Sequence, residues 1–332
     1  MFKVVVVGSG YIAQNHFEAL KNIEGAEAVA VVGRNEKTGT AAAEKYGCKW
    51  YSDLAQAVKE CGANVVDICL PTHLHEKYVI EAAELKCHVI CEKPITFTVA
   101  SFDRMAQACK DNGVRFMVAQ VARWWPEFMS IKQLIENGEI GDIHMIYEKR
   151  LCQHPTWSTW HRDPGKSGGG LYDLNIHDID YLCSIFGKPV SVYAAGWKSP
   201  TGCWNHVCTT LQWACGAKAV VETSLEMTGN WPFSIELRAT GDKGTIDYAL
   251  TAGFNINDGE AGSALHWFEA GKEECTPLEV EQTDMFAGEL KEFFDAINEN
   301  RETYVTEEQV RNVLEVIEAT IRSLENNSVE KL

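Results

Sequence analysis

VVVVGSGYIA, at residues 4–13, is the stretch that decides the fold of this 332-residue chain. Four consecutive valines predict a strand buried on both faces. The G-x-G-x-x-A pattern follows and leads into a helix that we expect from about Tyr11 to Ile23. In such a turn Gly8 permits the sharp bend, Gly10 lets backbone N–H groups approach a pyrophosphate, and Ala13 is small enough for the helix to pack on the strand. The pattern predicts a dinucleotide site, and a glycine turn in an α/β fold without nucleotide is the alternative.

Strands and helices alternate from this stretch to about residue 120. We expect strands at 4–7, 28–32, 65–70, 88–91 and 115–119, and helices at 11–23, 38–46, 53–61, 76–85 and 99–112. Strands separated by helices of this length form parallel βαβ units with right-handed crossovers. Residues 1–122 are therefore predicted to form an α/β Rossmann domain with a doubly wound parallel sheet.

The pattern changes after Trp124-Trp125-Pro126. A helix is expected at about 128–137 and a strand at 143–151, and glycines rather than helices separate further strands at 190–195, 207–213, 217–225, 234–239 and 244–248. Such a series favours a large, mostly antiparallel open sheet with one covered face. Helices at 285–298 and 307–326 end the chain, the second after a capping box at Thr306. Residues 123–332 are predicted to form an α+β domain.

The composition excludes several classes of function. With 30 Lys and Arg against 47 Asp and Glu, the formal net charge is −17. This charge argues against nucleic-acid binding and against docking on an anionic membrane. No apolar run approaches the roughly 18–20 residues that a spanning helix needs, and the valine run at the start is too short for a signal-peptide core. We expect a cytoplasmic protein.

The twelve cysteines are scattered and include no CxxC pair. In a cytosolic protein such residues are mostly small buried hydrophobes. Cys87-His88-x-x-Cys91 has the spacing of a metal clip, but it lies in an apolar run that we expect to be a strand, whose alternate side chains point to opposite faces. A second ligand pair is also missing, so no metal site is predicted.

The end of the second strand bears on the choice of cofactor. NAD-specific sites usually carry Asp or Glu at this point to bind the ribose 2′-hydroxyl, whereas this chain has Gly33-Arg34-Asn35. Arg34 is suited to pair with a 2′-phosphate or to stack on the adenine. An arginine in a loop is also often only solvated, so both NAD and NADP remain open.

Two further motifs carry chemistry. Glu92-Lys93-Pro94 follows a strand whose carboxyl end should face the ligand crevice. Gly168-Gly169-Gly170 opens an expected helix in which Asp173 and His177, four residues apart, would share one face. With Lys93 they form a set able to accept the hydroxyl proton when an alcohol is oxidised. Taken singly, Asp173 is equally suited to be a helix N-terminal charge, and His177 to be a partly buried structural histidine.

These motifs, in this order, resemble those of the Gfo/Idh/MocA (glucose–fructose oxidoreductase, inositol dehydrogenase, rhizopine catabolism) family over nearly the whole chain. The matching residues are Gly8-x-Gly10-x-x-Ala13, Pro71-Thr72-x-x-His75, His88-Val89-x-x-Glu92-Lys93-Pro94, Arg123-x-x-Pro126, Gly168-Gly169-Gly170-x-x-Asp173-x-x-x-His177 and Gly241-x-x-Gly244. One departure is Lys86-Cys87, where relatives commonly have Gly-Lys at this helix cap.

The resemblance implies a role for each matching residue. Lys93 would polarise the reacting oxygen, His177 would be the general acid/base, and Asp173 would bind a neighbouring hydroxyl. The residues expected to bind NAD or NADP are Gly8, Gly10, Tyr11, Ile12, Ala13, Gly33, Arg34, Pro71, Thr72, His75, Glu92, Lys93, Pro94 and Arg123. The residues expected to bind substrate are Lys93, Arg123, Trp124, Trp160, His161, Arg162, Asp173 and His177.

The substrate class implied is a sugar, a cyclitol or a glycoside, whose secondary alcohol is oxidised or whose ketone is reduced. Indoles at Trp124, Trp157 and Trp160 suit the apolar faces of sugars. Two alternatives are an NAD-dependent enzyme that cleaves glycosides by oxidation and elimination, and a nucleotide-sensing regulator. The resemblance also implies a homodimer or homotetramer that assembles through the sheet of the second domain, which would bind substrate as well.

Overall fold

The structure is a computed structural model that describes residues 1–155, 159–254 and 262–332, and it divides into two compact units. Unit 1 comprises Met1–Trp124 and Thr283–Arg311, and unit 2 comprises Trp125–Gln282 and Asn312–Leu332. The sequence predicted a single domain boundary after residue 122. The structure differs from this prediction, because the segment at 283–311 belongs to unit 1. The reason is apolar packing: Phe294 of α10 (Met285–Asn298) stacks on Phe2, with 4.7 Å between the ring centroids.

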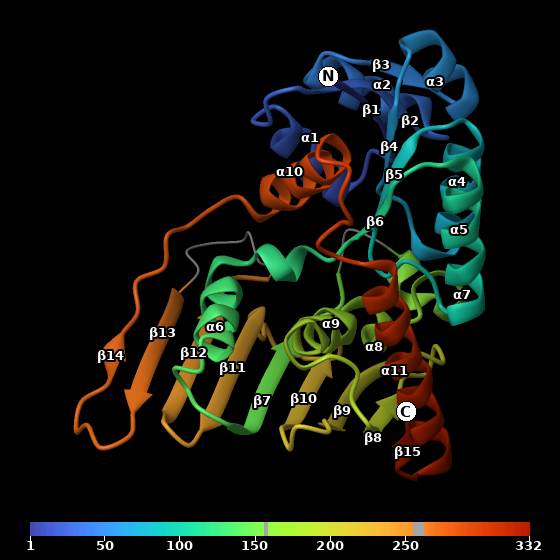
Figure 1. The fold of residues 1–332 in the computed structure, drawn as a ribbon. Coiled ribbons are helices and arrows are strands. Elements are labelled where there is room, and N and C mark those ends of the chain that lie inside the picture. Colours follow the sequence, from blue (N-terminus) through green and yellow to red (C-terminus); the bar gives the residue numbers. More distant parts are fainter. Residues whose placement is uncertain (156–158, 255–261) are drawn as a thin grey trace. The chain divides into compact units, whose positions relative to one another are not determined.

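Unit 1 contains a six-stranded sheet in the order β3-β2-β1-β4-β5-β6, in which every neighbouring pair is parallel (Figure 1). This confirms the predicted doubly wound fold. Its strands are β1 (Phe2–Val7), β2 (Ala26–Val32), β3 (Lys49–Tyr51), β4 (Val65–Ile68), β5 (His88–Glu92) and β6 (Phe116–Ala119). Its helices are α1 (Tyr11–Leu20), α2 (Glu36–Tyr46), α3 (Leu54–Cys61), α4 (His75–Glu84), α5 (Val99–Asn112) and α10, with short 3₁₀ turns at Thr72–Leu74 and Val121–Trp124.

The valine run forms the centre of this sheet. Val4–Val7 are at most 1% exposed, and they pair with β2 on one side and with β4 on the other. The strand order changes direction between β1 and β4, which is the point where open α/β sheets bind their ligands. Lys86, at the departure from the family pattern, adopts a φ of 63°, the left-handed conformation that favours the glycine of the relatives.

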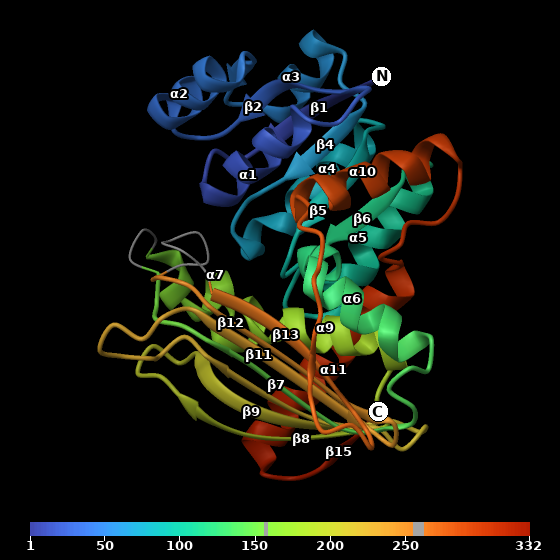
Figure 2. The same cartoon turned by 90° about the vertical axis from the view of Figure 1, so that its left-hand side faces the viewer.

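Unit 2 is built on a nine-stranded sheet in the order β14-β13-β12-β11-β7-β10-β9-β8-β15, antiparallel except for the β7–β10 pair (Figure 1). Figure 2 shows the same sheet after a turn of 90°. The strands are β7 (Ile143–Leu151), β8 (Ser191–Lys198), β9 (Trp204–Gln212), β10 (Lys218–Ser224), β11 (Ser234–Gly241), β12 (Gly244–Thr251), β13 (Gly262–Glu269), β14 (Thr276–Pro277) and β15 (Glu330–Lys331). The helices are α6 (Pro126–Glu136), α7 (Pro164–Ser167), α8 (Gly170–Asp173), α9 (Asn175–Phe186) and most of α11 (Glu307–Asn326), with a 3₁₀ turn at Trp160–Arg162.

One face of the large sheet is covered and the other is open. In β7 the even-numbered residues from Ile146 to Arg150 are buried beneath α9, whereas Met145 on the opposite face is 45% exposed. This agrees with the predicted open sheet. The sequence interpretation did not include β13, which pairs along its whole length with β12 but is only partly buried.

The helix predicted after the three glycines is in fact two helices. α8 ends at Asp173 and α9 begins at Asn175, with Leu174 between them at φ −107° and ψ −52°. The backbone N–H of His177 donates to the carbonyl of Leu174 rather than to that of Asp173. The prediction of one continuous helix face for Asp173 and His177 was therefore wrong.

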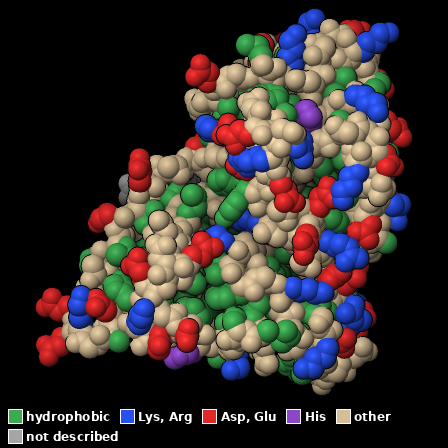
Figure 3. All heavy atoms as spheres, viewed as in Figure 1, with side chains coloured by type: hydrophobic (Ala, Val, Ile, Leu, Met, Phe, Trp, Pro, Cys, Tyr) green, Lys and Arg blue, Asp and Glu red, His purple; other side chains and the backbone are tan. Residues whose placement is uncertain are grey.

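Among the residues that the structure describes, no helix combines the length and the apolar character needed to span a membrane. On the face drawn in Figure 3, the described Asp and Glu side chains are interspersed with Lys and Arg rather than separated from them.

Candidate cofactor site and proton-handling residues

The glycine loop lies at the carboxyl end of β1, beside the residue that follows β4. Gly8 has a φ of +123°, and a Cβ atom there would lie 2.3 Å from the carbonyl oxygen of Cys69. Only glycine fits this position, because both the backbone conformation and the contact exclude a side chain. The first glycine therefore serves the close approach of the loop to β4.

Gly10 is constrained in a different way. It is the N-cap residue of α1, its φ of −77° is accessible to any residue, and a Cβ atom would meet nothing within 4 Å. The space around Gly10 is therefore open, and the first N–H groups of an α-helix have no carbonyl partner within the helix itself. An open helix N-terminus behind a glycine is the arrangement that binds pyrophosphate. Ala13, three residues later, is fully buried and packs the helix on the sheet.

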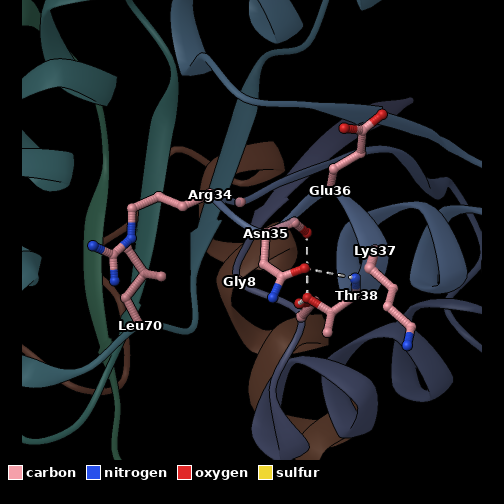
Figure 4. A pocket seen from close by; sticks show the side chains of 9 residues that line it. Gly8, Arg34, Asn35, Glu36, Lys37, Thr38 and Leu70 are labelled. Carbon is pink, nitrogen blue, oxygen red and sulfur yellow. Dashed lines mark hydrogen bonds between the residues drawn. The ribbon is translucent and has the colours of Figure 1, made fainter.

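A groove of about 950 Å³ adjoins this loop (Figure 4). It is lined by Gly8, Ser9, Gly33, Arg34, Asn35, Glu36, Lys37, Thr38 and Leu70. Asn35 caps α2 by accepting a hydrogen bond from the backbone N–H of Thr38 at 3.2 Å. The Arg34 side chain extends from the end of β2 toward Leu70, and the Glu36 carboxylate points away from Arg34 (Figure 4). The groove has the residues to hold the adenosine half of a dinucleotide: a glycine loop, an exposed guanidinium and amide and hydroxyl groups.

His75 is buried, and both of its ring nitrogens face backbone carbonyl groups. Nε2 lies 2.7 Å from the oxygen of Leu70 and Nδ1 lies 3.2 Å from that of Ile95. Burial lowers the pKa of His75, although the carbonyl contacts act in the opposite direction. The side chain thus joins the turn after β4 to the chain after β5. Pro71 and Thr72 lie in the same turn, and contact of these residues with a cofactor stays a prediction.

Lys93 follows the last residue of β5 and is half-buried. Its backbone N–H donates to Oε2 of Glu92 at 3.1 Å, and the peptide bond to the buried Pro94 is cis. The expected position of Lys93 at the carboxyl end of a parallel strand is confirmed.

Arg123 and Trp124, expected to bind substrate, are both buried within unit 1. The Arg123 guanidinium donates to Oε1 of Gln309 at 2.7 Å and lies over the ring of Tyr304, which also contacts Trp124 edge to face. These contacts tie the end of the first segment of unit 1 to its second segment. Substrate contact by Arg123 and Trp124 stays a prediction.

In unit 2, the structure brings Asp173 close to His161. Oδ2 of Asp173 lies 4.0 Å from Nε2 of His161, whose ring stacks on Trp160 with 3.9 Å between the centroids. His161 is buried, Arg162 is exposed, and Asp173 and His177 are each partly buried. Trp157 lies outside the described residues. Because Lys93 belongs to unit 1 and both Asp173 and His177 to unit 2, their meeting around one substrate stays a prediction.

Gly169 and Gly170, the last two of the three glycines, pack tightly against the start of β9. A Cβ atom at Gly169 would lie 2.5 Å from that of Cys203 and 2.6 Å from Oδ1 of Asn205. Asn205 accepts from the N–H of Gly170 at 2.9 Å and donates to Oε1 of Glu226 at 2.6 Å. The glycines therefore set the start of α8 against the sheet.

Sequence reasoning missed a polar set beside this turn. His154 Nε2 lies 3.1 Å from Oε1 of Glu226, and Asn205 links both residues to the Gly170 backbone. The three side chains are 21 to 72 positions apart in pairs and belong to no motif, so no local signal identified them. They are candidates for binding substrate hydroxyl groups.

Two family models match the chain. An oxidoreductase family model, the NAD-binding Rossmann fold of Gfo/Idh/MocA proteins, covers residues 2–120, and the C-terminal alpha/beta domain of the same family covers residues 132–332.

Three similar proteins illustrate the range of activities. The myo-inositol 2-dehydrogenase of Thermotoga maritima is 28% identical, over 99% of this chain and 98% of that protein. The 2,7-anhydro-N-acetylneuraminate hydratase of Mediterraneibacter gnavus is 34% identical over 185 residues, which is 55% of this chain and 48% of that protein. A levoglucosan dehydrogenase solved with NADH and levoglucosan shares the fold at a TM-score of 0.82 and 23% identity, over 99% of each chain.

Proposed function

Since the chain belongs to the Gfo/Idh/MocA oxidoreductase family and carries its NAD-binding Rossmann domain, we propose that it interconverts a secondary alcohol and a ketone of a sugar, a cyclitol or a glycoside. A bound nicotinamide supplies the acceptor or donor of the hydride. The observation that carries the proposal is the open space at Gly10, in a chain that also retains Lys93, Asp173 and His177.

The side chains of this protein handle the proton. In the oxidation, the Lys93 ammonium donates a hydrogen bond to the reacting oxygen and stabilises the charge that develops there. The His177 imidazole accepts the hydroxyl proton and returns it in the reduction, because its ordinary pKa is close to neutral. Asp173 accepts a hydrogen bond from a neighbouring hydroxyl group of the substrate. The 4.0 Å between Nε2 of His161 and Oδ2 of Asp173 supports a role for His161 in orienting this carboxylate.

We propose that NADP is accepted as well as NAD. Arg34 lies at the carboxyl end of β2, where NAD-specific proteins usually carry an acidic residue. Lys37 adds a second cation to the same groove. Both support binding of a ribose 2′-phosphate through charge-assisted hydrogen bonds.

A second candidate reaction has no net redox change, and the 34% identity to a hydratase over 185 residues favours it. The substrate would be oxidised to a ketone, which acidifies the proton on the adjacent carbon. Loss of this proton and of the alkoxy group on the next carbon would release an alcohol and leave an enone. Water would add to the enone, and hydride return from the same cofactor would reduce the carbonyl again. The product is a cleaved or hydrated sugar, and the cofactor ends in its starting state.

The decisive experiment is a panel of sugars, inositols, glycosides and anhydrosugars, each with NAD and with NADP, assayed by nicotinamide absorbance and by product identity. We expect Lys93→Ala and His177→Ala each to lower turnover by at least about 100-fold, the scale of a lost general acid/base, while the cofactor Kd stays unchanged. Lys59→Ala and His144→Ala replace exposed residues of the same types and serve as matched controls. Turnover at the level of the controls in either variant would remove that residue from the mechanism. Product release without cofactor reduction would select the second reaction.

We propose further that the protein is cytoplasmic and assembles as a homodimer or homotetramer through the open face of the large sheet. This face carries Met145 at 45%, Trp197 at 49% and Phe268 at 45% exposure. Exposed apolar side chains gathered on one sheet face support an interface between protein chains.

A further inference from the structure

A buried polar cluster in unit 1, which the proposed mechanism does not use, is centred on His16 of α1. Its ring is fully buried, and both ring nitrogens have acidic partners. Nδ1 lies 2.9 Å from Oδ2 of Asp67, and Nε2 lies 3.0 Å from Oε1 of Glu92. Asp67 is in β4 and Glu92 ends β5. One side chain from the helix behind the glycine loop therefore joins two neighbouring strands.

The ring satisfies both partners when it is the imidazolium, because carboxylate oxygens only accept hydrogen bonds. Burial opposes the charged ring, but the attraction of Asp67 and a smaller contribution from Cys69 raise the pKa of His16 well above its usual value. Burial also raises the pKa of the Cys69 thiol, which lies 3.5 Å from Oδ1 of Asp67 and donates to it. Glu289 of α10 places a carboxylate oxygen within 4.8 Å of ligand atoms of His16 and Glu92. The His16 ring thus lies among three acidic side chains, Asp67, Glu92 and Glu289.

Two groups of these side chains also have the spacing of metal ligands: His16 with Asp67 and Cys69, and His16 with Glu92 and Glu289. A nitrogen that binds a metal ion must have lost its proton. Each ring nitrogen of His16 lies within hydrogen-bond distance of a carboxylate, which accepts a hydrogen bond from a protonated nitrogen. The imidazolium already supplies the positive charge, so the geometry favours a hydrogen-bonded clamp.

Glu92 connects His16 to Lys93, the residue that follows β5. One oxygen of this carboxylate, Oε1, accepts from Nε2 of His16, and the other, Oε2, accepts from the backbone N–H of Lys93. We propose that His16 is a positioning residue, which holds the backbone of Lys93 through the Glu92 carboxylate. The inference rests on the proposed role of Lys93 in the reaction.

The physical reason is the rotational freedom of a glutamate side chain. Without the donor at Nε2, the Glu92 carboxylate can turn away, and the Lys93 N–H loses its acceptor. A misplacement of about 1 Å at a reacting group lowers turnover by about 100-fold. The link from Nδ1 ends on Asp67 of β4, whereas Lys93 follows β5.

Two substitutions separate the links. The amide nitrogen of Gln in His16→Gln occupies the place of Nε2 and can donate to Glu92, whereas that of Asn in His16→Asn occupies the place of Nδ1 and can donate only to Asp67. Both remove the buried cation, and Asn leaves the larger cavity because it is one methylene shorter than Gln. A merely structural role therefore predicts that the turnover of each variant follows its stability. If either variant fails to fold, both substitutions are repeated in a chain that also carries Asp67→Asn. This second change removes a buried carboxylate that no longer has a positive partner, and it should restore stability.

We expect His16→Asn to lower kcat by about 10- to 100-fold relative to His16→Gln, as a displaced reacting group would, while the cofactor Kd of the two variants agrees within about threefold. His144→Asn, at an exposed histidine, is the control for the substitution itself. Equal kcat values in the two His16 variants would overturn the inference, as would a kcat that follows only the melting temperature.

A readout without substrate separates this inference from the proposed function. Acetic anhydride labels lysine amines, and peptide mass spectrometry compares Lys93 with the exposed Lys59 in the same sample. We expect the ratio of Lys93 labelling to Lys59 labelling to change at least threefold in His16→Asn. In His16→Gln this ratio should stay near the wild-type value. A wild-type protein inactive on every substrate would refute the proposed function, and the labelling ratio would still decide the inference.

Discussion

The substitution Gly10→Ala tests the cofactor site most directly, because it adds one methyl group to open space in front of α1. Gly10 has φ −77° and ψ −172°, which alanine adopts without strain, and the new Cβ meets no atom within 4 Å. Restricting the unfolded chain favours alanine by about 0.4–1 kcal/mol, and alanine is worse than glycine as an N-cap by a similar amount. The free energy of unfolding should therefore change by less than about 1 kcal/mol.

The effect on cofactor binding should be much larger. The methyl group stands where phosphate oxygens would accept hydrogen bonds from the first turn of α1. A hydrogen bond to a charged group contributes about 1.5–3 kcal/mol, and each 1.4 kcal/mol corresponds to about a tenfold change in Kd. Loss of one such bond should raise the Kd for NADH by about 10- to 100-fold.

The assay is titration of NADH fluorescence, together with thermal unfolding of the same samples. Gly262→Ala is the matched control, because Gly262 also has open space around a Cβ but lies in β13 of unit 2. Gly8→Ala gives the opposite pattern: at φ +123° and 2.3 Å from a carbonyl oxygen, it should prevent correct folding of the loop. An unchanged NADH affinity in folded Gly10→Ala would refute the pyrophosphate site.

Two further predictions concern the groove and the large sheet. Arg34→Asp should weaken NADP binding at least tenfold more than NAD binding, because a carboxylate replaces the guanidinium near the 2′-phosphate. Calorimetry gives the two Kd values. If their ratio is the same as in the wild-type protein, Arg34 has no part in cofactor selection. Trp197→Glu places a charge on the open sheet face, where Trp197 is 49% exposed, and should lower the molar mass measured by light scattering. Trp231→Glu, at a residue outside the strands of the sheet, should leave the molar mass unchanged. A wild-type protein that is already a monomer would contradict assembly through this face.

The order and many of the bounds of the elements in both units could be predicted because the signals for them are local. The bounds predicted for α5 and β7 are those of the structure, and the β1 valines and the glycine loop lie where the pattern placed them. The break at Leu174 could not be predicted, since Gly169 and Gly170 before it pack against the start of β9, some 35 residues further along the chain. The half-exposed β13 lacks a strong apolar alternation and is held by its pairing with β12.

The sequence by itself determined the order of strands and helices, the parallel sheet of the first unit, the glycine loop and the family, because apolar periodicity and short motifs act over a few residues. Only the tertiary structure decided that the segment at 283–311 returns to the first unit, that His161 lies beside Asp173, and that His16 bridges Asp67 and Glu92 across 51 and 76 positions. Such contacts depend on which strands become neighbours, and this follows from burial of the whole core rather than from any stretch of residues.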